Sequence, residues 1–415
     1  MHVTNRRLIC RIAFLALCVL PTLLVIGRIV AYSIPGYRSS VQSQLAAMLG
    51  VGVSLGEVSH PRPGFVMLTN LRLFDPETDG ILATVQDLKV ALRSDRTVVR
   101  LGDATCQGRY LKKFYQTLHD GILCAPGNLA VPFQLNSRKI ILRQETGELT
   151  LNNLQIDYVP SSERSEATCT FHAADLGMSG PIVIRITRHH RVPTPMTAFT
   201  LQTHNSRLPC SGLAPFLPFV KGYGPDCTFN GAVWGVAHTD LGWQGEGAFE
   251  LSSVNLERLL GDRLSHHWSG DCTVQCERVR AESGRLTELR GTLVVRDGSV
   301  SGSLLQAACQ ELRVRHNASH DTYPADELIE FRELAVDLQL DQAGLELRGR
   351  RWDGYEDVLM YDDAGGIILR EPDPLDQPLP TITLVRIVDP SMNILRPATA
   401  NLLRFLPIPG QVTNE

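Results

Sequence analysis

Acidic residues at alternate positions make the segment from Asp75 to Gln86 the first place where the sequence has the composition of a metal site. A calcium-binding EF-hand loop has oxygen ligands at positions 1, 3 and 5, glycine at position 6 and a bidentate glutamate at position 12. Counted from Asp75, the chain supplies Asp75, Glu77, Asp79 and Gly80, but position 12 is Gln86. Glutamine cannot replace the bidentate carboxylate, and the flanking residues alternate in hydropathy as strands do. The segment is therefore predicted to be a turn between two strands.

A second cluster of metal-ligating side chains lies in "HHWSGDCTVQC", which contains His266, His267, Cys272 and Cys276. Structural zinc sites usually combine pairs of closely spaced ligands, and no C-x-x-C motif occurs in the chain. On a strand, the two cysteines would share one face, each free to pair elsewhere. We therefore predict no metal site.

No residues in the typical pattern of a nucleophilic or phosphate-binding enzyme are present. The chain lacks a G-x-S-x-G turn between a strand and a helix, and it lacks a glycine-rich phosphate loop with lysine. The formal net charge of −4 provides no basic face for nucleic acid. The chain is predicted to be non-enzymatic, without a cofactor or a nucleic-acid partner. An exported hydrolase is the weakest alternative, and it would require a pocket with converging carboxylates or histidines.

The N-terminus predicts export. Residues 12–32 are apolar apart from Arg28 and are just long enough for a bilayer core of ~30 Å. Arg6, Arg7 and Arg11 precede this run, so the positive-inside rule places the N-terminus in the cytoplasm. We predict a cytoplasmic basic tail over 1–11, a transmembrane helix over 12–32 and an exported region over 33–415. A cleaved signal peptide is the alternative, and the length of the run favours the anchor.

Eight cysteines follow the apolar segment, and an even number in an oxidising compartment permits four disulfides. Connectivity cannot be read from sequence. Cys106 with Cys124 and Cys210 with Cys227 are the first candidate pairs, because each pair flanks a short helix or loop.

Beyond residue 50, alternation with period 2 dominates the chain. "ELAVDLQLD" places Leu334, Val336, Leu338 and Leu340 on one face and polar residues on the other. A hairpin is predicted at Asp297-Gly298, and a β-bulge at Asn152-Asn153, where the alternation slips. Few helices interrupt the pattern. We expect them over 39–49, with Val41, Leu45 and Met48 on one face, over 110–120, and over 255–264 with Asn255 as N-cap. No βαβ rhythm is visible, so the fold class is mainly β: an elongated, twisted antiparallel sheet with a few covering helices.

The residues after the anchor carry a resemblance. "VQSQLAAMLGVGVSLGEVSHPRPGFVMLTNLRLFDPETDGILATVQDLKVAL" (residues 41–92) resembles the opening of the AsmA-like family of bacterial envelope proteins. There a short helix ending in L-G precedes a strand, and "PRPG" and "NLRLFDP" lie in the first hairpin. Similar segments are "LPCSGLAPFLPFV", "GAFELSSVNLERLLG" and "GRLTELRGTLVVRDGSVSGSLL". The eight exported cysteines and "HHWSGDCTVQC" depart from the family pattern.

The resemblance implies a single-pass inner-membrane anchor that carries a periplasmic β-groove, with a role in phospholipid movement between membranes or in outer-membrane biogenesis. The residues agree with this expectation, because a one-sided apolar sheet must be covered, and acyl chains can cover it at about 0.8 kcal/mol per buried CH₂. The expected lining is Leu71, Leu73, Leu88, Val90, Leu334, Val336, Leu338 and Leu340. The expected partners are the inner membrane, phospholipid and envelope proteins. The alternative is a disulfide-stapled exported β scaffold that recruits envelope proteins, in which the same residues form the dry core of a sandwich.

Overall fold

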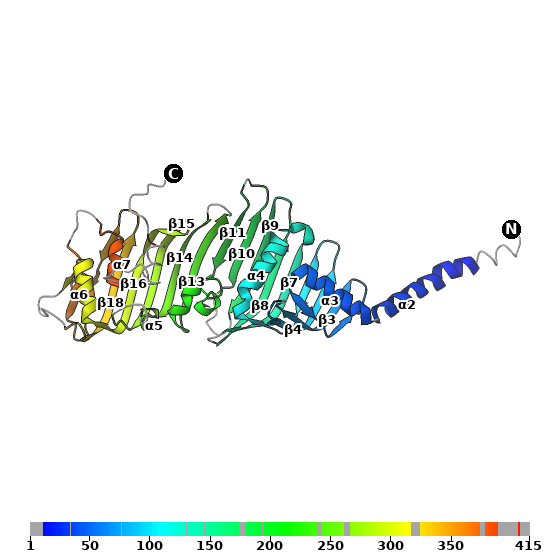
Figure 1. Ribbon diagram of the computed structural model, residues 1–415, viewed down its shortest axis with the longest axis horizontal. Helices are drawn as coiled ribbons and strands as arrows, with labels where there is room; N and C mark the ends of the chain where they lie inside the picture. The colour runs from blue at the N-terminus through cyan, green and yellow to red at the C-terminus, as the bar shows by residue number, and fades with distance from the viewer. Residues whose placement is uncertain are drawn as a thin grey trace.

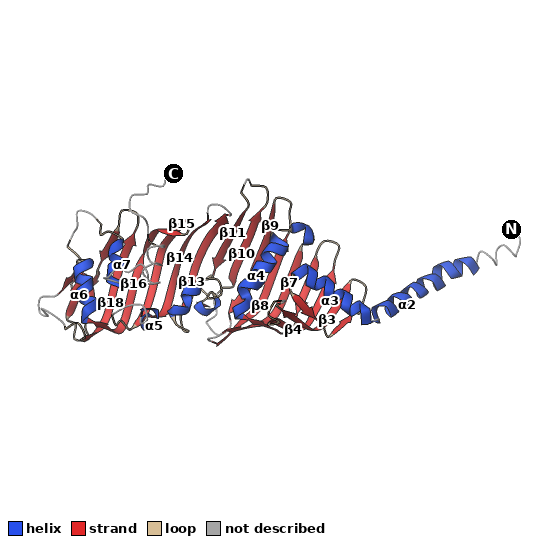
Figure 2. Cartoon of the chain, viewed as in Figure 1, coloured by secondary structure: helices blue, strands red, loops and turns tan. Residues whose placement is uncertain are grey.

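A single sheet of 22 strands runs through the chain, and most strands pair with their neighbours in sequence (Figure 1). The computed structural model describes residues 11–33, 35–75, 77–129, 131–144, 147–173, 180–192, 194–238, 242–260, 266–316, 324–373, 378–388 and 406. The sheet is elongated, and short helices lie along it (Figure 2). The predicted mainly β class is therefore confirmed.

The first strands form around the predicted turn at Asp75. Strand β3 (Phe65–Phe74) and strand β4 (Ile81–Leu92) form an antiparallel hairpin, which confirms the turn prediction. Strands β1 (Gly52–Ser54) and β2 (Glu57–Ser59) both pair with the free edge of β3. The first edge of the sheet is thus made of two short strands separated by a bend.

Parallel pairing occurs at one point, which corrects the prediction of a purely antiparallel sheet. Strands β5 (Thr97–Leu101) and β6 (Ala104–Gln107) pair antiparallel with β4 and parallel with β7 (Phe133–Gln144). A parallel neighbour requires a crossover connection. Here the crossover contains helix α4 (Leu111–Leu118), flanked by short turns η2 (Gly108–Tyr110), η3 (His119–Leu123) and η4 (Pro126–Leu129). The prediction that no βαβ unit exists is therefore wrong at this crossover.

The central strands form an antiparallel meander, extended by the short edge strand β12. They are β8 (Gly147–Val159), β9 (Arg164–Ala173), β10 (Ile182–His189), β11 (Met196–Gln202), β12 (Leu208–Pro209), β13 (Thr228–His238), β14 (Gly242–Asn255), β15 (Asp271–Glu282) and β16 (Arg285–Ser301). The predicted bulge in β8 is confirmed, because the register with β9 shifts between Asn152 and Gln155 and Asn153 has a φ of 51°.

The predicted hairpin at Asp297-Gly298 is wrong. Strand β16 continues through both residues and leads directly into helix α6 (Gly302–Glu311). A side chain at position 298 would overlap the ring of Phe331 and the carbonyl of Ser269, so this glycine allows close packing instead of a turn. The hairpin turn lies at Ser283-Gly284, where both residues have positive φ, 51° and 79°, as type I′ turns require.

The C-terminal strands form the last part of the sheet. Strand β18 (Leu328–Leu340) pairs with β16, and the remaining strands are β17 (Arg315–His316), β19 (Leu345–Arg348), β20 (Arg350–Trp352), β21 (Tyr355–Tyr361) and β22 (Ile367–Arg370). Helix α7 (Ile382–Val388) lies beside α6.

Residues 11–33 are helical: four α-helical residues, the π-turn η1 (Leu15–Val19) and helix α2 (Leu20–Ser33). No helix in the described part of the chain combines the length and the apolar character needed to cross a membrane. Helix α3 (Pro35–Leu49) follows and ends at Gly50, which has a φ of 65°. Its Leu45 and Leu49 pack on the sheet, whereas Met48 is 43% exposed.

Buried apolar side chains gather on one side of the sheet in two large clusters. The N-terminal core includes Val53, Leu71, Ile140 and Phe171, and α3 and α4 pack against it. The C-terminal core includes Phe229, Val295 and Phe331, and α6 contributes Leu304 and Leu305. Leu201 and Leu213 contact both cores. Helices thus cover the two ends of this side, and the middle is covered by the short turns η5 (Cys210–Gly212) and η6 (Pro218–Tyr223) and helix α5 (Leu256–Leu260).

Candidate functional site

An unbroken line of direct cross-strand partners crosses the sheet on the side that bears the two cores. We call this side the inner face and the line the apolar row, because its members are all apolar side chains or glycine. Direct partners in a sheet point to the same face. The row comprises Val66, Val90, Val99, Leu135, Ile156, Cys169, Ile184, Leu201, Val233, Gly247, Val279, Leu289, Leu340 and Leu345.

Most of the apolar row is half-buried. Leu340 and Leu345 are buried at its C-terminal end, at 2% exposure each, and the other members retain contact with solvent. Strand spacing of about 4.8 Å gives the row a length of roughly 60 Å. Several members also pack against the edges of the cores, among them Ile156, Ile184 and Val233, so the row is an apolar line that the protein covers only in part. Such a line is suited to a long, thin apolar ligand.

Cys169 belongs to this row as an apolar member. Burial raises the pKa of its thiol to about 12, so the thiol remains neutral and behaves as a small hydrophobic side chain. No reactive thiolate interrupts the row at this position.

The eight side chains predicted to line a groove all lie on the inner face. Val90 and Leu340 are members of the apolar row itself, although they come from opposite ends of the sheet. Leu71, Leu73 and Leu340 are buried in cores, whereas Leu88, Val90, Leu334, Val336 and Leu338 are half-buried. The eight side chains therefore share one face, and their lipid-lining role stays a prediction.

A second line of partners beside the apolar row brings aromatic side chains to the inner face. Phe133 pairs with Tyr158, Ile186 with Phe199, and Phe199 with Gly235. A side chain at position 235 would overlap the ring of Phe199, so the glycine lets this ring lie flat across β13. The aromatic line widens the apolar surface on the side away from the cores.

The next line of partners is polar and was missed by the sequence analysis. Ser165, Arg188 and Thr197 are direct partners on β9, β10 and β11, and the Arg188 Nη1 donates to Thr197 Oγ1 at 2.9 Å. Nearby, the π-turn η3 lies over the sheet, where the Tyr158 hydroxyl donates to the carbonyl of Ile122 at 3.2 Å. This line marks the polar rim of the inner face.

The π-turn gathers His119, Asp120 and Cys124 within metal-ligating distance of one another. The Nδ1 of His119 lies 2.8 Å from Asp120 Oδ1, and its Nε2 lies 3.0 Å from Thr197 Oγ1. Both ring nitrogens therefore have protein partners, and burial raises the pKa of the Cys124 thiol. A hydrogen-bonded chain from Arg188 through Thr197 and His119 to Asp120 accounts for these residues. We infer that this hydrogen-bonded chain fixes the π-turn η3 on the polar rim of the inner face.

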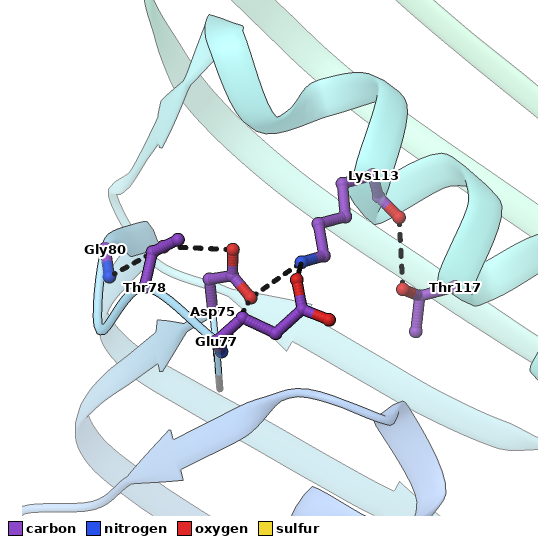
Figure 3. Close-up of polar contacts among 6 residues, drawn as sticks. All are labelled: Asp75, Glu77, Thr78, Gly80, Lys113 and Thr117. Atoms are coloured by element: carbon purple, nitrogen blue, oxygen red, sulfur yellow. Dashed lines mark hydrogen bonds and ion pairs between the residues drawn. The ribbon is translucent and has the colours of Figure 1, made fainter.

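The acidic turn that begins at Asp75 binds the ammonium group of Lys113, where a calcium-binding loop would bind a metal ion (Figure 3). Asp75, only 2% exposed, accepts from the Nζ of Lys113 at 2.8 Å, and Glu77 accepts from the same Nζ at 2.9 Å. The backbone N–H of Glu77 and the hydroxyl of Thr78 also donate to Asp75. Hydrogen bonding to Lys113 is the main cause that lowers the pKa of Asp75. Lys113 thus attaches α4 to the first hairpin, and both carboxylates already accept hydrogen bonds from this lysine.

The candidate cysteine pairs differ in geometry. Cys210 and Cys227 are fully buried, and their Sγ atoms lie 2.9 Å apart as thiols. Cys106 packs in the N-terminal core, whereas Cys124 lies beside His119, and both are free thiols. The structure therefore brings one of the two candidate pairs into contact.

The histidines and cysteines of "HHWSGDCTVQC" do not converge on one point. His266 Nδ1 lies 2.8 Å from Ser303 Oγ, and His267 Nε2 lies 3.3 Å from Ser299 Oγ. Cys272 and Cys276 share the inner face of β15, as their spacing predicted, and burial raises their pKa values to about 12 and about 11. The two cysteines are buried, and the two histidines are partly buried and hydrogen-bonded to serines.

Fold and inner face define the class of the protein: a single-sheet β protein whose one apolar face is only partly covered by its own helices. Searches against models of known protein families and against curated proteins found no match to this chain.

Proposed function

We propose that this protein is a membrane-anchored, non-enzymatic envelope protein that binds or conducts lipid acyl chains along the apolar row. The observation that carries the proposal is the row itself, which is continuous from β3 to β19 and half-buried over most of its length. Each methylene that leaves water contributes about 0.8 kcal/mol, so a chain of several methylenes on this row binds with useful affinity. Phospholipid transport or outer-membrane biogenesis is the corresponding process.

The anchor is the second part of the proposal. Eight apolar side chains on the N-terminal helical segment are each at least half exposed. They are Ile12, Phe14, Leu15, Leu17, Leu20, Leu23, Leu24 and Ile26. This segment projects away from the sheet (Figure 1). Exposed apolar residues of this density require a covering phase, and an inner membrane supplies one. The arginines before the segment favour a cytoplasmic N-terminus and a periplasmic sheet.

A scaffold that recruits envelope proteins is the second candidate function. The contact between Cys210 and Cys227 favours it, because a disulfide there would staple η5 and η6 to the start of β13. A scaffold requires no ligand on the apolar row, whereas the lipid proposal does.

Photo-crosslinking distinguishes the two candidates. A photo-crosslinking amino acid replaces Ile156, a member of the row, in the full-length protein expressed in its membrane. The matched control replaces Asp157, the next residue on β8, which lies on the outer face. Under the lipid proposal, we expect mass spectrometry to detect phospholipid adducts at position 156 and few at position 157. Equal or absent adducts at both positions would overturn the lipid proposal and leave the scaffold.

A further inference from the structure

A cavity of about 220 Å³ lies on the outer face, opposite the apolar row, at the end of the sheet next to the N-terminal helices. Its floor contains Phe65, Ala91 and Val98, which are direct partners on β3, β4 and β5. These positions alternate with the inner-face residues Val66, Val90 and Val99. Val98 is 8% exposed although it faces outward, because the segment before β3 lies close to it.

The charged residues around this cavity are all cationic, and the uncharged Pro61, Val66 and Met67 complete its lining. Arg62, Lys89, Arg93 and Arg100 line it, and no acidic residue does. The guanidinium of Arg62 lies 3.5 Å above the ring of Phe65, which holds it over the apolar floor. Lys89 is 3.5 Å from Asp87, and the pKa of Asp95 is lowered mainly by its hydrogen bond with Arg96 and to a smaller extent by the charge of Arg93. Among the described residues, no carboxylate forms an ion pair with Arg62 or Arg100. Two arginines that line the cavity thus have no carboxylate partner in the part of the chain that the structure describes.

We propose that this cavity binds the head region of an anionic phospholipid of the membrane that holds the anchor. The phosphodiester fits the planar guanidinium donors of Arg62 and Arg100, which recognise phosphate through paired N–H groups. The apolar floor takes the glycerol and the first methylenes of the acyl chains. Position supports the same occupant, because β1 to β3 directly follow α3, which itself follows the proposed anchor helix α2. The site would hold the first strands of the sheet against the membrane surface.

This inference rests on the proposed anchor, and it is separate from lipid on the apolar row. A basic residue near an anionic membrane surface contributes about 1 kcal/mol, which corresponds to roughly five-fold in affinity. Loss of both Arg62 and Arg100 should therefore weaken binding of anionic lipid by roughly 25-fold. A zwitterionic lipid of the same chain length has a compensating cation, so its binding should be weak and unchanged.

The test uses the full-length protein in detergent, titrated with short-chain phosphatidylglycerol, with phosphatidylcholine of equal chain length and with inorganic phosphate. Native mass spectrometry measures lipid occupancy, and hydrogen exchange locates it. The variant is R62Q/R100Q, and the matched control is R185Q/R278Q, which removes two outer-face arginines that form ion pairs with glutamates. R62K/R100K keeps the charge but lacks the paired planar N–H donors, so it should bind more weakly than the parent protein and more tightly than R62Q/R100Q.

We expect R62Q/R100Q to raise the half-saturating phosphatidylglycerol concentration about 25-fold, and the control to leave it unchanged. Protection from exchange should appear at residues 61–67 and 89–100. Equal affinity in both variants, equal binding of phosphatidylcholine, or displacement by an equal concentration of inorganic phosphate would overturn the site. Protection confined to residues 182–201 would overturn this site and support the apolar row, whereas protection confined to the cavity would support the site and count against the row.

Discussion

A charge placed in the middle of the apolar row is the sharpest test of its role. Ile184 lies near the centre of the row, with Cys169 and Leu201 as its direct partners. Ile184→Asp puts a carboxylate at a point that an acyl chain lying on the row must cover. Val183→Asp is the matched control, because Val183 is the neighbouring β-branched residue, is also half-buried and points to the outer face.

The size of the effect follows from the row geometry. A chain that avoids Asp at position 184 lifts away from β10 and loses contact over about one strand spacing, ~4.8 Å. Because the row covers only one side of the chain, the methylenes over that strand lose about half of their burial. Loss of about two buried methylenes costs roughly 1.6 kcal/mol. A chain that instead covers the carboxylate must desolvate an unpaired ion, which costs several kcal/mol in a protein interior. Taking the half-burial of the site into account, we expect a total loss of about 3 kcal/mol, or roughly a hundred-fold in affinity.

The assay titrates the full-length protein with a phospholipid that carries a fluorescent acyl chain, and urea unfolding runs in parallel. Both variants should lose a similar 1–2 kcal/mol of stability, because both put a charge at a half-buried strand position. Only Ile184→Asp should lose the hundred-fold in lipid affinity. Equal lipid affinity in the two variants, with both folded, would refute the reasoning. If Ile184→Asp does not fold, Ile184→Thr keeps the β-branch and should still weaken binding, while Val183→Thr should not.

Three further changes test the contacts that hold the fold in place. Oxidation should join Cys210 and Cys227 in a disulfide and raise the free energy of unfolding by about 3 kcal/mol for a loop of this length. This free energy should then fall when reductant is added. C210S/C227S should remove that sensitivity to reductant, and C106S/C124S should not. Lys113→Met should destabilise the protein at pH 7, because buried Asp75 loses its cation. Since the pKa of Asp75 is lowered in the folded state, this stabilisation is present above the ordinary aspartate value of about 3.9 and is lost as the pH falls through the folded value. Urea unfolding at pH 7 and pH 3 should therefore show a smaller difference between variant and parent at the lower pH. Asn255→Ala should cost about 1 kcal/mol in urea unfolding, because Asn255 Oδ1 accepts from the N–H of Arg258 at 2.7 Å as an N-cap, and Asn255→Asp should cost little.

Period-2 alternation predicted the faces well because it is a local property of each strand. Val90 and Leu340 were assigned to one apolar face from their own segments, and the structure places both in one row. The row itself could not be predicted, because it depends on register between strands and on bulges such as the one at Asn153. A shift of one residue at any junction would have turned the later strands over.

The features that the sequence analysis missed all depend on contacts between distant segments. Lys113 reaches Asp75 across 38 residues, so nothing near the turn indicates that its charge is already balanced. The parallel crossover through α4 was missed because β5 and β6 are too short to show a βαβ rhythm. Asp297-Gly298 was misread because the same dipeptide that favours a turn also permits close packing against Phe331. In each case tertiary packing decides between local alternatives.

The two ends of the apolar row differ, and the difference gives the proposal a direction. At the C-terminal end, Leu340 and Leu345 are buried together with Leu379 and with Val385 of α7, so protein atoms cover the row there. At the N-terminal end, Val66, Val90 and Val99 remain half-buried, and among the described residues they belong to neither of the clusters that include α6 and α7. If acyl chains occupy the row, they therefore enter at the end next to the anchor and advance toward β18. The cationic cavity lies on the outer face of these same first strands. One short stretch of the sheet would therefore bind an anionic lipid head group on its outer face and an acyl chain on its inner face.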